Sequence, residues 1–346
     1  MTLVEESRFL TAPSFKNPSR TSVNLNGDAA VANRSGGITK YWAVEERCSD
    51  TNGTPGIQTS TGRDDVLEWD DEECRAWHTP MDCASQRPIA WTRGTAEEDV
   101  HGNVTYVDQK LWTTCITWDL DAVDVHYMNG DTGEVERTIE VPYADLTAPG
   151  LNGGVKQFTA YGGAVDAGDH FWFHPIGDEG RLVRVDANDF TYKTWEKPYR
   201  DGYGIAVDGN GRVWSCGSGE IDRFDPDTET WERTGVLSTI GGCMADAEDR
   251  LWASGRGDRT VVAIDINTLE QVAEWTIESM AKGISIDFEG YVWAIGYGYL
   301  GGGNEDAFKI DPDTGEYETY GGLDGPYTYS DMTGFALANA GILPVE

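Results

Sequence analysis

The sequence lacks any long apolar run and is poor in basic residues. No stretch approaches the roughly 20 apolar residues that a membrane-spanning helix requires, so we expect no transmembrane segment. Only 26 Lys and Arg residues stand against 60 Asp and Glu residues, which gives a formal net charge of −34. Such a chain would be repelled by a phosphate backbone, which excludes nucleic acid as a partner. The charge instead indicates a highly soluble acidic protein.

Sequence signatures of common catalytic sites are also absent. There is no Gly-x-Ser-x-Gly nucleophile elbow, no His-Glu-x-x-His metal motif and no phosphate-binding loop. Histidine is scarce, and the five present are His78, His101, His126, His170 and His174. These absences favour a binding or structural protein over an enzyme.

A Cys-x-x-Cys pair is lacking, yet six cysteines are present. An even number without metal-type spacing indicates disulfides formed in an oxidising compartment. Six cysteines allow fifteen connectivities, and proximity in sequence favours Cys48–Cys74, Cys83–Cys115 and Cys216–Cys243. We therefore expect an extracellular, cell-surface or periplasmic protein.

The start, "MTLVEESRFLTAPSF", has no apolar core and is not a signal peptide, so we expect a mature or trimmed form whose export signal is missing.

What the sequence has in abundance is glycine and tryptophan, arranged in a repeat. The segments "AVDAGDHFWFHP", "AVDGNGRVWSCG", "MADAEDRLWASG" and "SIDFEGYVWAIG" begin at Ala164, Ala206, Met244 and Ser285. Their tryptophans (Trp172, Trp214, Trp252 and Trp293) recur about every 40 residues, the period of a four-stranded propeller blade. The fold class predicted is an all-β propeller built from four-stranded antiparallel blades.

Turn chemistry divides each repeat into strands. A strand such as "GIAVD" leads through a Gly- or Asp-rich turn to the Trp strand, and "DPDTG" leads to the outer strand. In "DPDTG" the aspartates suit a turn, with Pro preset at its second position, so we interpret them as turn residues and not as catalytic ones.

The first half of the chain carries the same unit in looser form. Val31 and Trp112 occupy the tryptophan position, and nearly two periods separate them, so the first blade must contain an insertion, assigned to residues 48–84. Six units can be counted within one domain spanning 1–346. We expect seven blade positions, the last one thin, with six as the alternative. The chain end "SDMTGFALANAG" resembles an unfinished inner strand, and "LVEESRFLTA" is the one candidate to complete it. An unpaired strand of this kind predicts self-association into an oligomer.

These repeats, "GIAVDGNGRVWSCGSGEIDRFDPDT" above all, resemble the streptogramin (virginiamycin B) lyase-like and NHL-type β-propellers. The resemblance runs from about Ser22 to Asn339. The Cys-flanked acidic insertion and "PSRTSVNLNGDAAVANR" are similar to a secreted bacterial subgroup without assigned activity. The resemblance implies a propeller and, as an alternative function, a metal-dependent C–O lyase or hydrolase with histidine and a glutamate-bound Mg²⁺ at the propeller centre.

Only His174 lies where such a catalytic residue could face the channel. The equivalent positions of the following blades are Cys216, Ser254 and Ile295, so no second histidine or carboxylate converges there. We therefore predict a non-catalytic protein that binds a protein or glycan on one propeller face. Tyr203, Tyr327, Tyr329 and the Gly-rich loop 296–306 could supply aromatic contacts there, although packing between blades is the favoured interpretation.

The segment "CSDTNGTPGIQTSTGRDDVLEWDDEEC" contains the strongest local motif. Oxygen-bearing residues at alternate positions follow the start of an EF-hand calcium loop, with Ile57 at the apolar eighth position. Two departures weaken the match: Pro55 replaces the usual glycine, and Thr61 replaces the bidentate glutamate. The sequence predicts a Ca²⁺ site with these candidate ligands: Asp50, Asn52, Thr54, Gly56, Asp64 and Asp65. The alternative is an acidic solvated loop held by Cys48–Cys74 alone.

Overall fold

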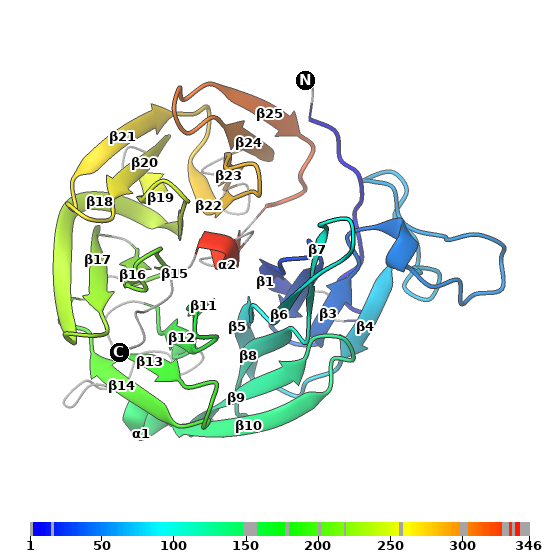
Figure 1. Ribbon diagram of the computed structural model, residues 1–346, viewed down its shortest axis with the longest axis horizontal. Helices are drawn as coiled ribbons and strands as arrows, with labels where there is room; N and C mark the ends of the chain where they lie inside the picture. Colours follow the sequence, from blue (N-terminus) through cyan, green and yellow to red (C-terminus); the bar gives the residue numbers. More distant parts are fainter. Residues whose placement is uncertain are drawn as a thin grey trace.

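The structure is a ring of β-sheets arranged as propeller blades around a central axis (Figure 1). This computed structural model describes residues 3–14, 17–147, 158–176, 180–199, 202–217, 219–255, 259–297, 304–326, 332–333 and 336–339. Neighbouring strands within each blade are antiparallel. The predicted fold class, an all-β propeller with four-stranded antiparallel blades, is confirmed.

Six four-stranded blades follow one another along the chain. The first contains β1 (Pro18–Val23), β2 (Ala29–Asn33), β3 (Gly37–Tyr41) and β4 (Arg75–Thr79). The second contains β5 (Ser85–Trp91), β8 (Lys110–Ile116), β9 (Ala122–Asn129) and β10 (Val135–Pro142). The third contains β11 (Gly162–Val165), β12 (Phe171–His174), β13 (Arg181–Val185) and β14 (Tyr192–Glu196). The fourth contains β15 (Gly204–Val207), β16 (Val213–Cys216), β17 (Gly219–Asp225) and the first part of β18 (Thr230–Ala245). The rest of β18 joins β19 (Arg250–Gly255), β20 (Thr260–Asp265) and β21 (Gln271–Thr276) in the fifth. The sixth contains β22 (Ala281–Ile286), β23 (Val292–Gly296), β24 (Asp306–Ile310) and β25 (Tyr317–Gly321).

Several shorter elements lie outside the four-stranded blades. The 3₁₀ helix η1 (Glu45–Arg47) follows β3, and α1 (Tyr143–Leu146) follows β10. A hairpin of β6 (Thr95–Glu98) and β7 (Val104–Val107) is inserted in the second blade, which the sequence did not predict. Near the end of the chain lie β26 (Met332–Thr333) and α2 (Ala336–Asn339), and α2 occupies the centre of the ring (Figure 1).

The predicted repeat is visible as one hydrogen-bonding unit in four successive blades. In each of these blades an aspartate follows the inner strand and accepts three hydrogen bonds. One comes from the indole of the tryptophan on the second strand, and two come from backbone amides in the turn between the inner and second strands. In the fourth blade Asp208 accepts from Trp214 Nε1 at 2.8 Å and from the amides of Asn210 and Arg212 at 2.8 and 3.0 Å. The equivalent Asp–Trp pairs are Asp166–Trp172, Asp246–Trp252 and Asp287–Trp293.

The "DPDTG" turn at Asp311 and its relative "DPDTE" at Asp225 behave as predicted. Oδ1 of Asp225 accepts the amide hydrogens of Asp227 and Thr228, and Oδ1 of Asp311 does the same for Asp313 and Thr314. These carboxylates hold the turns between the third and fourth strands. Their assignment as turn residues is confirmed.

The three predicted disulfides are all present, and no described cysteine is free. Cys216 ends β16 of the fourth blade, and Cys243 lies in the part of β18 that belongs to the fifth blade. This bond therefore joins two neighbouring blades. Cys48–Cys74 instead closes the excursion of the first blade.

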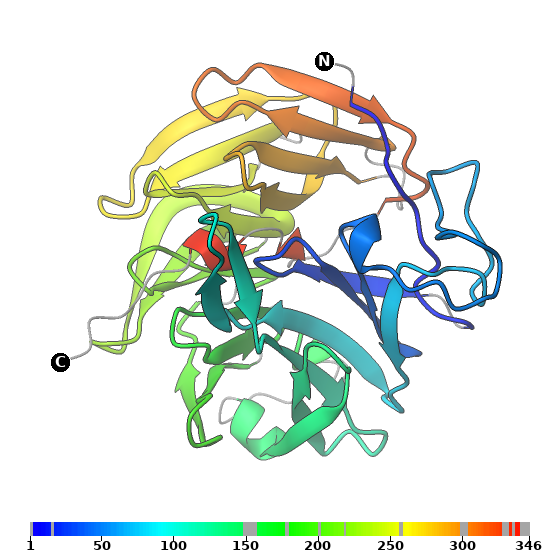
Figure 2. The same ribbon diagram turned by 45° about the vertical axis from the view of Figure 1, so that its right-hand side comes forward.

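The closing position between the sixth and first blades is thin, as predicted. The two-residue β26 pairs in parallel with β1 and also lies against β22. The N-terminal segment, residues 3–14, passes from the edge of the sixth blade to the first (Figure 2). In the part of the chain that is described, no further four-stranded sheet occupies this position.

The predicted first-blade insertion is an excursion between β3 and β4 that projects from the ring (Figure 1). β4 falls within residues 48–84 and pairs with β3 as the outer strand of the blade. The part outside the sheet therefore runs from residue 42 to residue 74.

Candidate functional site

The projecting loop of the first blade is organised by two adjacent carboxylates. Glu73 accepts the amide hydrogens of Thr51, Asn52 and Gln58 at 2.6, 2.9 and 2.8 Å. These amides lower the pKa of the Glu73 carboxyl, with the bond from Gln58 the largest contribution. Neighbouring Glu72 is buried and accepts bonds from Thr59, Ser60 and Cys74. Neither residue was predicted from the sequence, although two acidic side chains directly before a cysteine mark the position.

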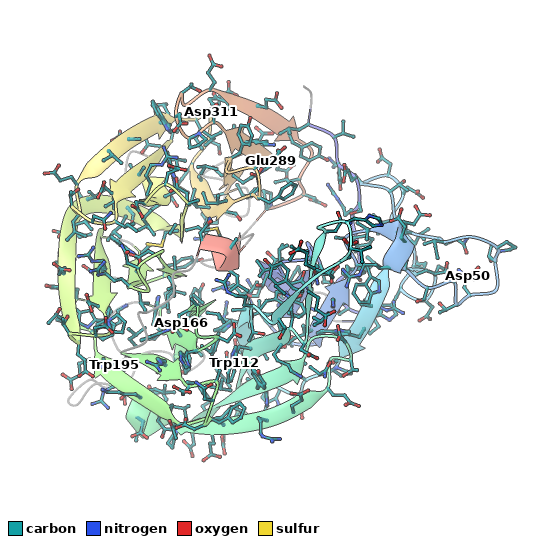
Figure 3. All side chains as sticks on the ribbon, viewed as in Figure 1. Asp50, Trp112, Asp166, Trp195, Glu289 and Asp311 are labelled. Atoms are coloured by element: carbon teal, nitrogen blue, oxygen red, sulfur yellow. A yellow bond between two sulfur atoms is a disulfide. The ribbon has the colours of Figure 1, made fainter. Side chains whose placement is uncertain are left out.

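The predicted calcium ligands all lie on this loop. Asp50 is exposed, and Figure 3 shows it on the loop away from the ring. Asn52 Oδ1 already accepts the amide hydrogen of Thr54, and Asp65 Oδ2 accepts the hydroxyl of Thr61. Gly56 and Asp64 are exposed. Within the described ranges, no three side chains of His, Cys, Asp or Glu form a group able to hold a metal ion. The predicted set also includes Asn52, Thr54 and Gly56, so the calcium site stays a prediction.

His174 lies at the end of β12 and is completely buried. Its Nδ1 lies 2.6 Å from the carbonyl oxygen of Pro175, and Nε2 lies 3.1 Å from that of Gly204. Burial, more than any neighbouring charge, lowers the pKa of His174 to about 3, so the imidazole is neutral at physiological pH. Both ring nitrogens face backbone oxygens of neighbouring blades. A neutral imidazole carries one N–H and can donate to only one of these two oxygens, and a bond from Nε2 to Gly204 would link the third blade to the fourth.

One end of the central channel is filled by basic and aromatic side chains, which we call the channel cluster. Its members come from the beginning of inner strands in five blades: Arg20, Arg87, Tyr161, Tyr203 and Lys282. Each is at most 7% exposed. The inner strands of a propeller line its axis, so residues at equivalent positions converge even though they are far apart in the sequence.

The members contact one another through ring faces. The guanidinium carbons of Arg20 and Arg87 lie 4.7 and 4.8 Å from the ring centre of Tyr161. Tyr161 and Tyr203 have ring centres 5.1 Å apart, and Lys282 Nζ lies 4.5 Å from the ring of Tyr203. Cations over aromatic faces are stabilised by the ring quadrupole, by about 2 kcal/mol when desolvated. Three cation–π contacts and one contact between tyrosine rings therefore connect the cluster.

Positive charge is concentrated at this end of the channel. Burial, followed by the charge of Arg20, lowers the pKa of Lys282 to about 8. Lys282 therefore still carries most of its charge at neutral pH. Arg20, Arg87 and Lys282 thus place three basic side chains in one cluster of a chain whose net charge is −34. An anionic group beside such side chains would favour their charged forms.

Of the three tyrosines that the sequence offered as candidates for a binding face, only Tyr203 lies in the described part of the chain. Tyr203 is buried in the channel cluster, so it packs between blades as favoured. Tyr327 and Tyr329 lie outside the described residues, as does most of the loop 296–306.

No helix in the described part of the chain is long and apolar enough to cross a membrane.

Solved structures share the fold at low sequence identity. A catalytically inactive variant of virginiamycin B lyase from Staphylococcus aureus, determined with quinupristin, matches with a TM-score of 0.53 and 14% identity, over 93% of this chain and 87% of that chain. The β-propeller domain of Myceliophteria thermophila Cps50 (Swd1) matches with a TM-score of 0.56 and 12% identity, over 88% and 86% of the two chains. The RRP9 WD40 repeats match with a TM-score of 0.53 and 10% identity, over 79% and 71%. No protein-family model and no curated protein matches the sequence. The class is thus a β-propeller, and the predicted resemblance to streptogramin lyase-like propellers is confirmed at the level of fold.

Proposed function

We propose that this chain is a secreted, non-catalytic β-propeller that binds an anionic group, presented by a protein or a glycan, at the end of the channel that holds the channel cluster. The observation that carries the proposal is the convergence of Arg20, Arg87 and Lys282 with tyrosine rings on one end of the axis. Three disulfides fit an oxidising, extracytoplasmic compartment.

Arginine suits this task because its planar guanidinium can donate two parallel hydrogen bonds to one carboxylate or sulfate. The tyrosine rings hold the cations in place before the ligand arrives, which reduces the conformational entropy lost on binding. An anionic ligand would also raise the pKa of Lys282 and hold its ammonium group in the charged form.

The test is calorimetric titration of the whole chain with two probes, trigalacturonate and a tetraglutamate peptide, which separate the glycan source from the protein source. We expect one probe to bind, with affinity falling as the pH rises through 8 because Lys282 loses its charge. Arg87→Gln and Lys282→Gln should each weaken binding by about tenfold, roughly the contribution of one charged hydrogen bond. Arg137→Gln, on an exposed part of β10, is the matched control. Absence of binding by both probes, or equal affinity in all variants, would refute the proposal.

The alternative function is a metal-dependent lyase or hydrolase, for which the structural similarity supplies the fold alone. Its one histidine candidate, His174, is buried and faces two backbone carbonyls, which offers no support for catalysis. A panel of cyclic esters and glycans assayed with the wild-type chain and His174→Ala tests this alternative. If the wild-type chain turns over a substrate and His174→Ala does not, the enzymatic proposal is supported and the non-catalytic one is refuted.

Calcium stabilisation of the first-blade loop is a separate part of the proposal. It is supported by the spacing of Asp50, Asn52 and Thr54 in the sequence. If Ca²⁺ binds, saturating metal should raise the free energy of unfolding by about 3 kcal/mol at a hundredfold excess over its dissociation constant. A melting midpoint that EGTA leaves unchanged would remove calcium from the proposal.

Self-association is the remaining alternative for the partner. The thin closing position between the sixth and first blades motivates it, because unpaired strand edges accept strands from other chains. Size-exclusion chromatography over a wide concentration range tests it, and a monomer at all concentrations would exclude it.

A further inference from the structure

The junction between the sixth and first blades differs from the other junctions in the burial of its tryptophan. Trp112, Trp172, Trp214 and Trp252 are 0% exposed. Each packs with buried residues of the next blade. Trp293, at the same position of the sixth blade, is partly exposed. Its indole is still fixed, since Nε1 donates to Asp287 Oδ2 at 2.8 Å. The ring closes less tightly here than elsewhere.

A cavity of about 740 Å³ lies at this junction. One wall is the face of the sixth blade, with Trp293 and Ile295 on β23, Ala307 on β24 and Tyr320 on β25. Leu3 and Val4 of the N-terminal segment form part of the opposite wall. A volume of roughly 300–1,000 Å³ with apolar walls and a few polar groups is typical of small-molecule sites.

The N-terminal wall is held in place by polar contacts with the sixth blade and by ring stacking on the first. Arg8 forms an ion pair with Glu5 at 2.6 Å and donates to the carbonyl oxygen of Gly322 at 2.9 Å. The hydroxyl of Tyr320 donates to the same Glu5 carboxylate. On the first blade, the ring of Phe9 stacks on that of Tyr41 with centres 4.3 Å apart. The cavity is therefore preformed between two fixed walls.

We propose that this junction cavity is a binding site for an aromatic small molecule that carries no negative charge. The partly exposed indole of Trp293 offers an aromatic surface against which a ligand ring can stack. The charge of Arg8 is already balanced by Glu5, and Asp324 on the cavity lining adds a negative charge. Together with the net charge of −34, these groups disfavour an anion. The site is independent of the channel cluster and does not rest on the function proposed above.

The test uses N-phenyl-1-naphthylamine, a neutral aromatic dye whose fluorescence rises in apolar surroundings, with its sulfonated relative 1-anilinonaphthalene-8-sulfonate as the anionic comparison. We expect saturable binding of one neutral dye per chain, and weaker binding of the sulfonate. Ala307→Phe places a ring inside the cavity and should weaken neutral-dye binding by about tenfold or more. Leu323→Trp fills the cavity from its rim and serves as a second variant if Ala307→Phe fails to fold.

Val272→Phe is the matched control, since it adds a ring to the exposed face of β21 away from the cavity. Unchanged dye affinity in both filled variants would overturn the assignment, as would the absence of saturable binding. A concentration-dependent dimer that excludes the dye would also overturn it, because side chains of a second copy would then occupy the cavity. Arg87→Gln should leave dye binding intact, so this test and the anion-binding test can fail separately.

Discussion

Trp214 Nε1 donates a hydrogen bond of 2.8 Å to Oδ2 of Asp208, and both side chains are 0% exposed. The same carboxylate holds two amide hydrogens of the turn between β15 and β16. One aspartate thus fixes the inner strand, the turn and the tryptophan that packs between blades. Recurrence of this arrangement in four blades makes it the structural unit of the propeller.

We expect Asp208→Ala to lower the free energy of unfolding by about 3 kcal/mol, because it leaves a buried indole donor and two turn amides without an acceptor. Urea unfolding followed by fluorescence measures the change. Asp227→Ala, in the exposed turn after β17, should change stability by less than about 0.5 kcal/mol. Equal losses of unfolding free energy in the two variants would show that the buried Asp208–Trp214 pair stabilises the protein no more than an exposed turn residue does.

Stability should fall as the pH is lowered from about 6.5 toward 3, in part through His174. Burial lowers the pKa of His174 to about 3, whereas an unfolded histidine titrates near 6.5. Between these values the unfolded chain binds a proton that the folded chain does not, so acid favours unfolding, by on the order of 4 kcal/mol. His174→Gln should reduce the slope of stability against pH, and His101→Gln, at an exposed position, should not. Identical slopes in the three proteins would contradict this assignment.

The disulfide between Cys216 and Cys243 should stabilise the contact between the fourth and fifth blades. Replacing both cysteines by serine removes a cross-link over a sequence separation of 27, and we expect a loss of about 3 kcal/mol. The paired substitution Cys48→Ser and Cys74→Ser tests the projecting loop instead and should affect the ring less. Calorimetric melting of both variants provides the comparison. A larger loss from the loop disulfide would mean that the loop supports the first blade.

Glu73 should control the order of the projecting loop. Glu73→Gln removes the charge that three backbone amides share, so the amides of Thr51, Asn52 and Gln58 should exchange their hydrogens faster. Hydrogen exchange measured by mass spectrometry on loop peptides checks this, with Glu68→Gln as the control. Unchanged exchange would show that Cys48–Cys74 orders the loop by itself.

Prediction from the sequence succeeded where the signal is local and repeated. The tryptophan period predicted the blades, the "DPDT" turns predicted where the outer strands begin, and the pairing of neighbouring cysteines predicted the disulfides. It missed the β6–β7 hairpin, because this two-stranded insertion has no counterpart in other repeats. It also gave His174 a possible place at the channel mouth, where the structure instead shows a buried side chain between two carbonyl oxygens.

The sequence by itself determined the class of fold, because strand alternation, turn residues and repeat length are properties of short segments. Only the tertiary structure decided which side chains meet. Arg20 and Tyr161 are 141 residues apart and come together because inner strands of different blades share one axis. The partly exposed Trp293 occupies the same position of the repeat as its buried equivalents. Its surroundings differ because the last blade meets the first across a thin closing strand and the N-terminal segment, and no single repeat encodes that contact.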